Sequence, residues 1–451
     1  MSPSAKSVLR YAALVVGAGG MIGVGWVGLA QILRADAFAK FHGDGSPIGA
    51  EVGVELTDFH MKAYEEGRLS AEVTVDKVAV RRDRSQMAMT GLHDGTFYEE
   101  DGESFSFEAD EAVYHYFTKR LDAASGVHIV NEEMDLVSDR FSYDQSSGNL
   151  VVSGRVTGTL NGGEIEAADV SLNTKTDAIK ARDVRWVGEL DDLGQDGQKK
   201  KWDIHGAYFE SDGEVSVYTD ARATDGEIIV VADRIEYTKE TDVLVAKGNV
   251  KYWGPDANVM SAEATVYRKE RRAVMTGNVT MFIKAEDDDE VTETEIPALE
   301  RVAPESLQTD PQGATDEQIE VLRSDENLRD FPVKVIADKV EYWYRKGERR
   351  AVITGSPFAR QDMAEGWRLG WSVTAFYDGE AETLTLKGRD GKQEVRFILS
   401  IGDDLVASEM TISTKEGDNR SSGKNVHAFL YLDEDDEQSS SGGSTGGGTG
   451  G

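Results

Sequence analysis

The sequence predicts an all-β fold made of stacked β-hairpin repeats, preceded by one transmembrane helix at the N-terminus. Three observations lead to this prediction. A motif with aspartate, tyrosine and glycine at fixed spacing recurs along the chain. Apolar and polar residues alternate within each copy with a period of two, as they do in half-buried strands. An uncharged apolar stretch precedes the first copy.

The N-terminal apolar stretch, residues 11–33, is long enough to cross about 30 Å of hydrocarbon as a helix. Lys6 and Arg10 precede it, so the positive-inside tendency places residues 1–10 in the cytoplasm and the bulk of the chain across the membrane. Small residues before Gln31 leave a second interpretation open, a signal peptide cleaved at that point. We expect a single-pass anchor, because the stretch exceeds the usual apolar length of a signal peptide.

The repeat is clearest when ADRIEYTKETDVLVAKGNVKYW (Ala232 to Trp253) is laid over SDRFSYDQSSGNLVVSGRVTGTL (Ser138 to Leu160). Aspartate, tyrosine and glycine fall at the same offsets in both. Weaker copies carry Asp76, Asp110, Glu263 or Asp338 at the acidic position, and a half-copy begins at Asp169. Successive copies start about 30 residues apart, which is typical of stacked supersecondary units.

Each copy reads as a β-hairpin, because polar segments at 144–149 and 238–242 separate two alternating runs. A lone hairpin is marginal in water, so the copies are expected to bury their apolar face against an opposing sheet. Stacked copies would join that apolar face into one continuous seam. It comprises Phe141, Tyr143, Leu150, Val152, Val156 and Leu160 in the first copy, and Ile235, Tyr237, Leu244, Ala246, Val250 and Tyr252 in the second.

Composition divides the rest of the chain. Residues around 285–332 begin with an acidic run, contain prolines and lose the alternation, which predicts a mobile insertion. The last residues are acidic and then rich in serine and glycine, too polar to join a core. The expected order is 1–10 cytoplasmic, 11–33 anchor or signal peptide, 34–69 linker and first strands, 70–284 repeats, 285–332 insertion, 333–432 second β block and 433–451 disordered tail.

Charge and residue usage exclude several classes of function. The formal net charge of −34 repels a phosphate backbone, so nucleic acid is not an expected partner. The chain has 0 cysteines, which removes disulfides, thiolate nucleophiles and cysteine metal sites. Its histidines are scattered and no catalytic motif is found, so we expect no catalytic residue, no metal and no cofactor.

The motifs resemble a known family. ADRIEY followed by LVAKGNV, AEATVY with VMTGNV, and ADKVEY with VITGSP look like the OstA-type repeats of periplasmic lipopolysaccharide-transport proteins, the LptA and LptC group. A single N-terminal helix before the repeats is similar to LptC. The resemblance implies an elongated, curled and incompletely closed β-jellyroll, whose apolar groove shields the acyl chains of lipopolysaccharide. It also implies end-to-end docking of such proteins through open edge strands, one of them near Leu384.

Taken with the residues, the resemblance leads us to expect a periplasmic bridge component, without enzymatic activity, that carries lipopolysaccharide or a similar lipid from the inner to the outer membrane. Its expected partners are that lipid, an inner-membrane ABC transporter and other OstA-like bridge proteins. Two alternatives stay open: a structural envelope scaffold with a sealed β core and no lipid, and a carbohydrate-active enzyme on a stacked β fold.

Overall fold

A computed structural model describes residues 52–430, except 66, 99–103, 133, 161, 174, 177, 192–197, 286–290, 310–314, 316–318, 321, 323–330, 346, 364 and 416–419. The chain forms two compact units. Unit 1 contains the described residues up to Tyr252 together with Glu263–Arg272, and unit 2 contains Trp253–Ala262 and the residues from Ala273 onward. The described regular structure is strand apart from short helical turns, which confirms the all-β prediction.

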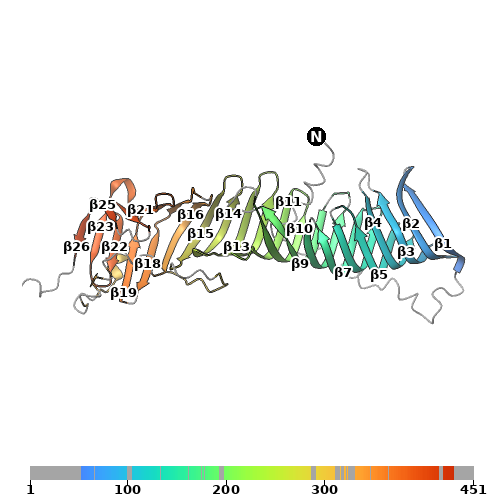
Figure 1. Cartoon of the computed structure of the whole chain (residues 1–451), viewed down its shortest axis with the longest axis horizontal. Helices are drawn as coiled ribbons and strands as arrows, with labels where there is room; N and C mark the ends of the chain where they lie inside the picture. Colours follow the sequence, from blue (N-terminus) through green and yellow to red (C-terminus); the bar gives the residue numbers. More distant parts are fainter. Residues whose placement is uncertain are drawn as a thin grey trace, which may run out of the picture. The chain divides into compact units, whose positions relative to one another are not determined.

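Unit 1 is a meander of long strands, labelled in chain order in Figure 1. From β1 to β12, each strand pairs antiparallel with the next strand in the chain. The strands are β1 (Val52–Glu65), β2 (Arg68–Arg81), β3 (Gln86–Tyr98), β4 (Ser104–His115), β5 (Arg120–Val130), β6 (Met134–Asp144), β7 (Asn149–Leu160), β8 (Gly163–Asn173), β9 (Ala178–Asp191), β10 (Lys199–Ser211), β11 (Val215–Thr224) and β12 (Ile229–Thr238). The strands β13 (Val243–Trp253), β14 (Ala257–Tyr267) and β15 (Arg272–Ile283) follow and are divided between the units.

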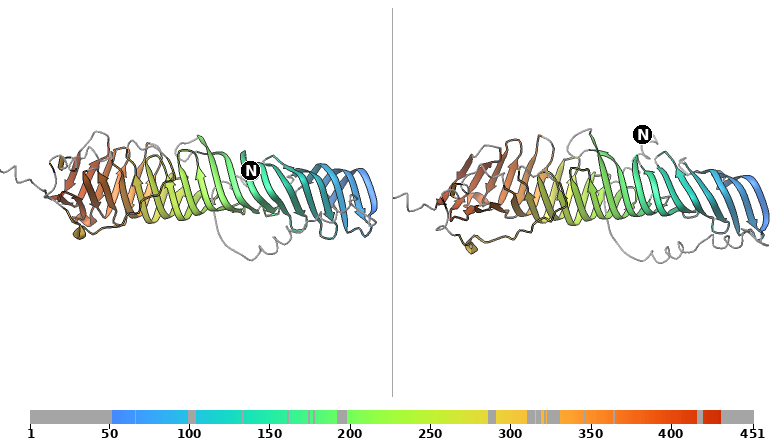
Figure 2. Two further views of the ribbon diagram at one scale, coloured as in Figure 1. Left: turned by 90° about the horizontal axis from the view of Figure 1, so that it is seen from below. Right: turned by 60° about the horizontal axis from the view of Figure 1, so that its bottom comes forward.

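The long strands of unit 1 bend near their middles (Figure 2). The pairing register shifts there, for example between Val137 and Arg140 in β6 and between Ser153 and Val156 in β7. Each bend divides its strand into two halves. We call layer A the halves that carry Phe141 and Leu150, and layer B the halves that carry Leu136 and Leu160.

The two layers face each other across an apolar interior. Phe97 in layer B lies against Tyr143 in layer A with ring centroids 4.7 Å apart, although β3 and β6 are not paired. Phe107 and Phe141 make an edge contact at 5.7 Å in the same way. The opposing sheet that the sequence requires is therefore the other half of the same strands.

The bends explain the recurring aspartate and glycine. Gly154 has φ +91° and faces the carboxylate of Asp139, while Gly248 has φ +73° and faces Asp233. Only glycine adopts such a left-handed conformation without strain, and a Cβ on Gly248 would lie 2.3 Å from the Asp233 Oδ2 atom. The same pairing joins Gly91 to Asp76, Gly126 to Asp110 and Gly355 to Asp338. The copy at Glu263 departs from it, because its glycine, Gly277, faces Ala262.

Unit 2 repeats this plan with shorter strands. Two sheets share β16: its first half pairs with β18 and its second half with β17. One sheet continues from β17 through β20, β21, β24 and β25, and the other from β18 through β19, β22, β23 and β26. The strands are β16 (Val333–Trp343), β17 (Arg350–Thr354), β18 (Phe358–Met363), β19 (Gly366–Trp371), β20 (Thr374–Asp378), β21 (Thr383–Lys387), β22 (Val395–Leu399), β23 (Asp404–Ala407), β24 (Glu409–Ser413), β25 (Ser421–Lys424) and β26 (His427–Phe429).

The predicted insertion at 285–332 contacts unit 2 through its described residues. We call residues 291–309 the strap. The indole Nε1 atoms of Trp253 and Trp371 donate to the carbonyl oxygens of Thr294 and Val302, each at 2.9 Å. Farther along the chain, Leu322 is only 1% exposed. These residues pack against unit 2 although the segment is acidic. The prediction that residues 285–332 form a mobile insertion therefore does not fit them.

Two further expectations concern the ends of the chain. Leu384 was expected near a free edge, but its strand β21 lies between β20 and β24, so it is interior to its sheet. The predicted anchor at 11–33, the N-terminal residues 1–10 and the tail at 433–451 lie outside the described residues. Among the residues that are described, no helix has the length and apolar character needed to span a bilayer.

Candidate functional site

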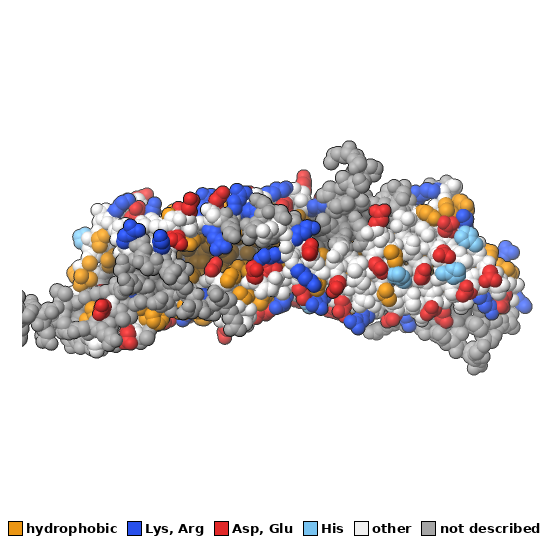
Figure 3. Space-filling view, in the orientation of Figure 1, with side chains coloured by type: hydrophobic (Ala, Val, Ile, Leu, Met, Phe, Trp, Pro, Cys, Tyr) orange, Lys and Arg blue, Asp and Glu red, His pale blue; other side chains and the backbone are white. Residues whose placement is uncertain are grey.

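The interior of unit 1 is a continuous apolar core. It runs from Val73 on β2 to Val250 on β13, and it includes aromatic side chains from both layers. Period-two alternation produces it: Phe105, Phe107 and Ala109 point inward, while the residues between them are exposed. Charged side chains of both signs lie on the outer surface of the molecule (Figure 3). The strands thus separate an apolar interior from a charged outer surface.

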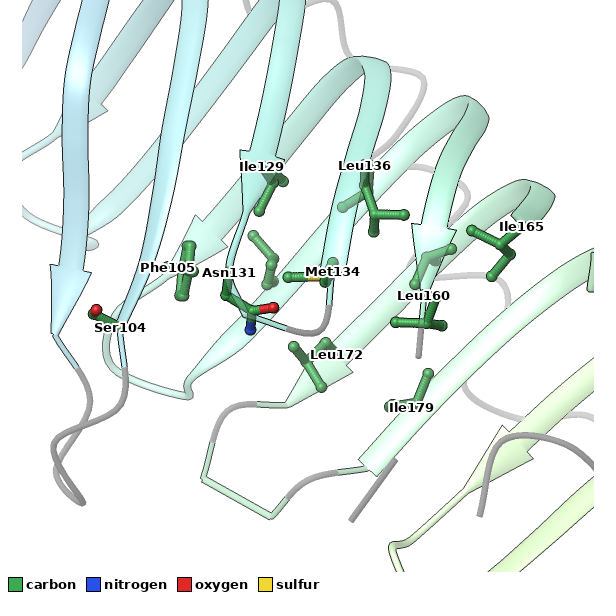
Figure 4. A pocket seen from close by; sticks show the side chains of 13 residues that line it. Ser104, Phe105, Ile129, Asn131, Met134, Leu136, Leu160, Ile165, Leu172 and Ile179 are labelled. Carbon is green, nitrogen blue, oxygen red and sulfur yellow. The ribbon is translucent and has the colours of Figure 1, made fainter. Parts of the chain in front are cut away.

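A cavity of about 50 Å³ interrupts this core between the two layers. Figure 4 shows side chains from several strands that converge on it. Layer A contributes Leu150, Val152, Val170, Leu172 and Ile179, and layer B contributes Phe105, Ile129, Leu136, Leu160 and Ile165, with Ser104, Asn131 and Met134 at the strand ends. Only Ser104 and Asn131 bring polar side chains to a lining that is otherwise apolar. A lining of this kind suits hydrocarbon rather than a charged group.

Ten of the twelve residues predicted for the apolar surface, all but Tyr237 and Tyr252, belong to the apolar core of unit 1 or pack against it, although not all line the cavity. In the first copy Phe141, Leu150, Val152, Val156 and Leu160 are buried and Tyr143 is half-buried. In the second copy Ile235, Ala246 and Val250 are buried, and Tyr237, Leu244 and Tyr252 are half-buried. The cavity takes Leu150, Val152 and Leu160 from the first copy and none from the second.

The hydroxyl group of the half-buried Tyr237 is held by a hydrogen bond to a neighbouring carboxylate. This hydroxyl donates to Asp242 Oδ1 at 3.0 Å, and the same oxygen accepts from Arg268 Nη1 at 3.0 Å. Burial and this bond to Asp242 both raise the pKa of Tyr237, so the phenol stays neutral. Arg268, which follows β14, is thereby held in an ion pair with Asp242.

The cavity also uses residues that the repeat comparison did not single out. Ile165, Leu172 and Ile179 come from β8 and β9, which correspond to the half-copy at Asp169. A signal was present, since Ile165 and Ala167 alternate with Glu164 and Glu166, and Val170 and Leu172 flank Ser171. The missing glycine of that half-copy removed these strands from the comparison. The cavity therefore extends from the better preserved first copy into the next hairpin.

A buried ionic group lies on the outer side of layer A, close to the core. Asp122 is 8% exposed and accepts from Arg120 Nε at 2.8 Å, while His115 Nε2 lies 3.2 Å from its other oxygen. Burial acts to raise the pKa of Asp122, but the hydrogen bond with His115 and the charge of Arg120 outweigh it and hold the pKa below 3.8. Within the described ranges, no group of three His, Asp or Glu side chains is placed to hold a metal ion.

The first strand of unit 1 presents a free edge. In the pairings of the described residues, β1 bonds to β2 and to no other strand. Most of its side chains are exposed, among them Val54 at 50% and Tyr64 at 65%. A row of unpaired backbone groups beside exposed apolar side chains can accept a further strand.

Comparison with known proteins places part of this structure in a family. Residues 135–292 match the model of the family described as LptA/(LptD N-terminal domain) LPS transport protein. No curated protein shows significant sequence similarity to the chain.

A solved structure, that of LptH, the LptA-homologous periplasmic component of the lipopolysaccharide transport device of Pseudomonas aeruginosa, aligns with 10% identity over 45% of this chain and 94% of its own. Its TM-score of 0.18 is too low to carry an argument. The family match begins in β6 and includes the two best copies of the repeat, which are the copies on which the resemblance rests. The resemblance is thereby confirmed over residues 135–292, which match the model of this family.

Proposed function

We propose that unit 1 is a periplasmic lipid carrier that shields the acyl chains of lipopolysaccharide, or of a similar lipid, between layers A and B. The observation that carries this proposal is the apolar interior with a hydrocarbon-lined cavity between two layers that are joined along their bends. Each buried methylene contributes roughly 0.8 kcal/mol and needs no directional bond. The family match over residues 135–292 supports the same conclusion.

Lipid entry requires the layers to move apart. A cavity of about 50 Å³ holds only a few water-sized groups, and an acyl chain is larger. Because the layers are connected at the bends and not at the strand ends, separation at the strand ends opens the interior while the pairing within each layer persists. The aromatic contacts of Phe97 with Tyr143 and of Phe107 with Phe141 would be exchanged for contacts with the chain.

The partners follow from the same proposal. A carrier that does not itself consume energy moves lipid only along a gradient of affinity. An ATP-driven transporter in the inner membrane is therefore the expected donor of the lipid. The free edge at β1 would receive a strand of another bridge protein. An N-terminal anchor at residues 11–33 would hold the chain at the inner membrane, with its bulk in the periplasm.

Photocrosslinking in intact cells tests the proposal. A photoreactive residue replaces Ile179, which lines the cavity, or Lys180, its exposed neighbour on the other face of β9. We expect a lipid adduct at position 179 and none at 180, because only the first faces the interior. Tyr237 and Glu236 offer a second pair of neighbours.

A sealed scaffold is the second candidate function, and the small cavity favours it. In that case neither Ile179 nor Tyr237 would yield a lipid adduct in a folded, correctly located protein. An adduct of equal strength at positions 179 and 180 would indicate lipid on the surface only.

A further inference from the structure

Trp202 on β10 carries a buried hydrogen-bond donor without an acceptor. Its side chain belongs to the apolar core of unit 1 and is 8% exposed. Its indole Nε1 atom is buried and has no hydrogen-bond partner among the described residues. A buried N–H that loses its bond to water and gains no other destabilises the folded state, so such groups are rare in native proteins.

Other indoles of this chain show which acceptor such a group finds here. Trp186 Nε1 donates to the carbonyl oxygen of Leu160 at 3.1 Å. In unit 2 the indoles of Trp253 and Trp371 donate to carbonyl oxygens of the strap. In each case the acceptor is a backbone carbonyl oxygen. Trp202 has the same donor, and the described residues offer it no such acceptor.

The position of Trp202 between layers A and B suits contact with a ligand better than contact with another segment of the chain. It lies opposite Gly188 in the pairing of β9 with β10, near the beginning of β10. Trp186 covers Gly163 and Gly188, where a Cβ would come within 2.4 Å and 2.3 Å of its ring. The end of β7, the start of β8 and the start of β10 lie at the same end of the strands of layer B. Leu160 lines the cavity at this end, and Trp202 lies near the same end of the layer.

Charge argues against an ionic ligand at this point. Lys200, two residues before Trp202 and on the same face of β10, is engaged by Glu227 at 2.6 Å and by Asp225 at 3.3 Å. A neutral acceptor attached to hydrocarbon satisfies the indole without bringing a charge into the core. The carbonyl of a fatty acyl ester or amide has this chemistry, because it joins an apolar chain to a polar headgroup.

We propose that Trp202 Nε1 donates a hydrogen bond to the acyl carbonyl of a lipid whose chain lies between layers A and B. This inference rests on the proposed lipid-carrier function and adds a specific polar contact to it. Trp202 then sets the depth at which the carbonyl stops, while the alkyl chain continues inward along the core.

The experiment compares two lipids with the same headgroup and chain length: a dipalmitoyl glycerophospholipid with ester carbonyls and its dihexadecyl ether analogue. Binding to the purified protein is measured by competition in mixed detergent micelles. Wild-type protein should prefer the ester by about three- to tenfold, the value of one neutral hydrogen bond. Trp202→Phe should remove this preference, because it removes the N–H donor and retains an aromatic ring at this position. Trp186→Phe, whose indole is already satisfied, should keep the preference.

Infrared spectroscopy of a ¹³C-carbonyl ester bound to the wild-type protein gives a second readout that needs no variant. A hydrogen bond lowers the carbonyl stretching frequency, and we expect a lowered band. Equal binding of the two lipids together with an unshifted band would overturn the inference and leave the lipid-carrier function intact. Binding of neither lipid would count against the carrier function itself and would overturn both.

Discussion

Phe97 and Tyr143 meet across the interior of unit 1 with their ring centroids 4.7 Å apart, although their strands β3 and β6 share no hydrogen bond. The contact joins layer B to layer A. Phe97 also stacks on Phe107 at 4.6 Å, so it connects neighbours in its own layer to the opposing one. Contacts of this kind hold the layers together away from the bends.

Removing the Phe97 ring should weaken the closure of the layers. For Phe97→Ala we expect a loss of about 2 kcal/mol or more in the free energy of unfolding, because a half-buried ring and its aromatic contacts disappear. Urea denaturation followed by circular dichroism measures the loss. Phe117→Ala, which removes a ring that is 82% exposed at a hairpin turn, is the control and should stay within about 0.5 kcal/mol of the wild type.

The bends should tolerate no side chain at their glycines. In Gly248→Ala the new Cβ meets Asp233 at 2.3 Å in a residue with φ +73°, so both backbone strain and a clash act. Gly213→Ala has a comparable φ of +91° with nothing within 4 Å, so only strain acts. We expect about 1 kcal/mol of destabilisation for Gly213→Ala and a further 1–3 kcal/mol for Gly248→Ala. Equal losses in thermal unfolding would mean that the carboxylate yields freely.

The ion pairs of Asp122 predict a stability that depends on pH. Its pKa in the folded protein lies below the ordinary 3.8, so the folded state favours the carboxylate. The contribution is complete above about pH 4 and is lost as the pH falls through the lowered pKa. Asp122→Asn should cost on the order of 2 kcal/mol at pH 7 and much less at pH 3.

Unfolding of both proteins across this pH range tests the prediction for Asp122. Glu214→Gln, at an exposed carboxyl in a hairpin turn, provides the control. A gap between Asp122→Asn and the wild type that stays constant from pH 7 to pH 3 would show that the carboxylate does not titrate with folding.

The packed part of the acidic segment should stabilise unit 2. Leu322 is 1% exposed and its carbonyl accepts from Arg368 Nε at 2.9 Å. Leu322→Ala should cost about 2–5 kcal/mol through the cavity it leaves. Val426→Ala, at a side chain that is 45% exposed, should have little effect. Chemical denaturation of the full chain measures both, and an unchanged midpoint for Leu322→Ala would mean that this segment does not support the unit.

The strand pattern of unit 1 could be predicted because two copies of one motif agree. The polar segment at 144–149 does contain the turn between β6 and β7, and Phe141 and Leu150 are buried as their parity indicates. The folding of each strand on itself could not be predicted. Gly248 and Asn249 both have positive φ at the bend, yet Ala246 and Val250 on either side of it have the same parity and are both buried, so the sequence reads as one uninterrupted strand.

The strap was missed for a different reason. Ile296 in the strap and Leu322 beyond it lie in an acidic, proline-containing stretch whose few apolar residues do not follow the alternation of a strand. Their burial depends on grooves that exist only once unit 2 has formed. The indole donors of Trp253 and Trp371 that hold the strap likewise come from distant parts of the chain.

Because each strand from β1 to β12 pairs with the next, the length of unit 1 is proportional to its number of strands. Each strand adds one spacing of about 4.8 Å to its length, so gaining or losing one hairpin changes the reach of the unit by about 10 Å. The cross-section stays the same, since every bend is built from residues of adjacent strands. The length of this unit can therefore change through the gain or loss of repeats, without redesign of the core.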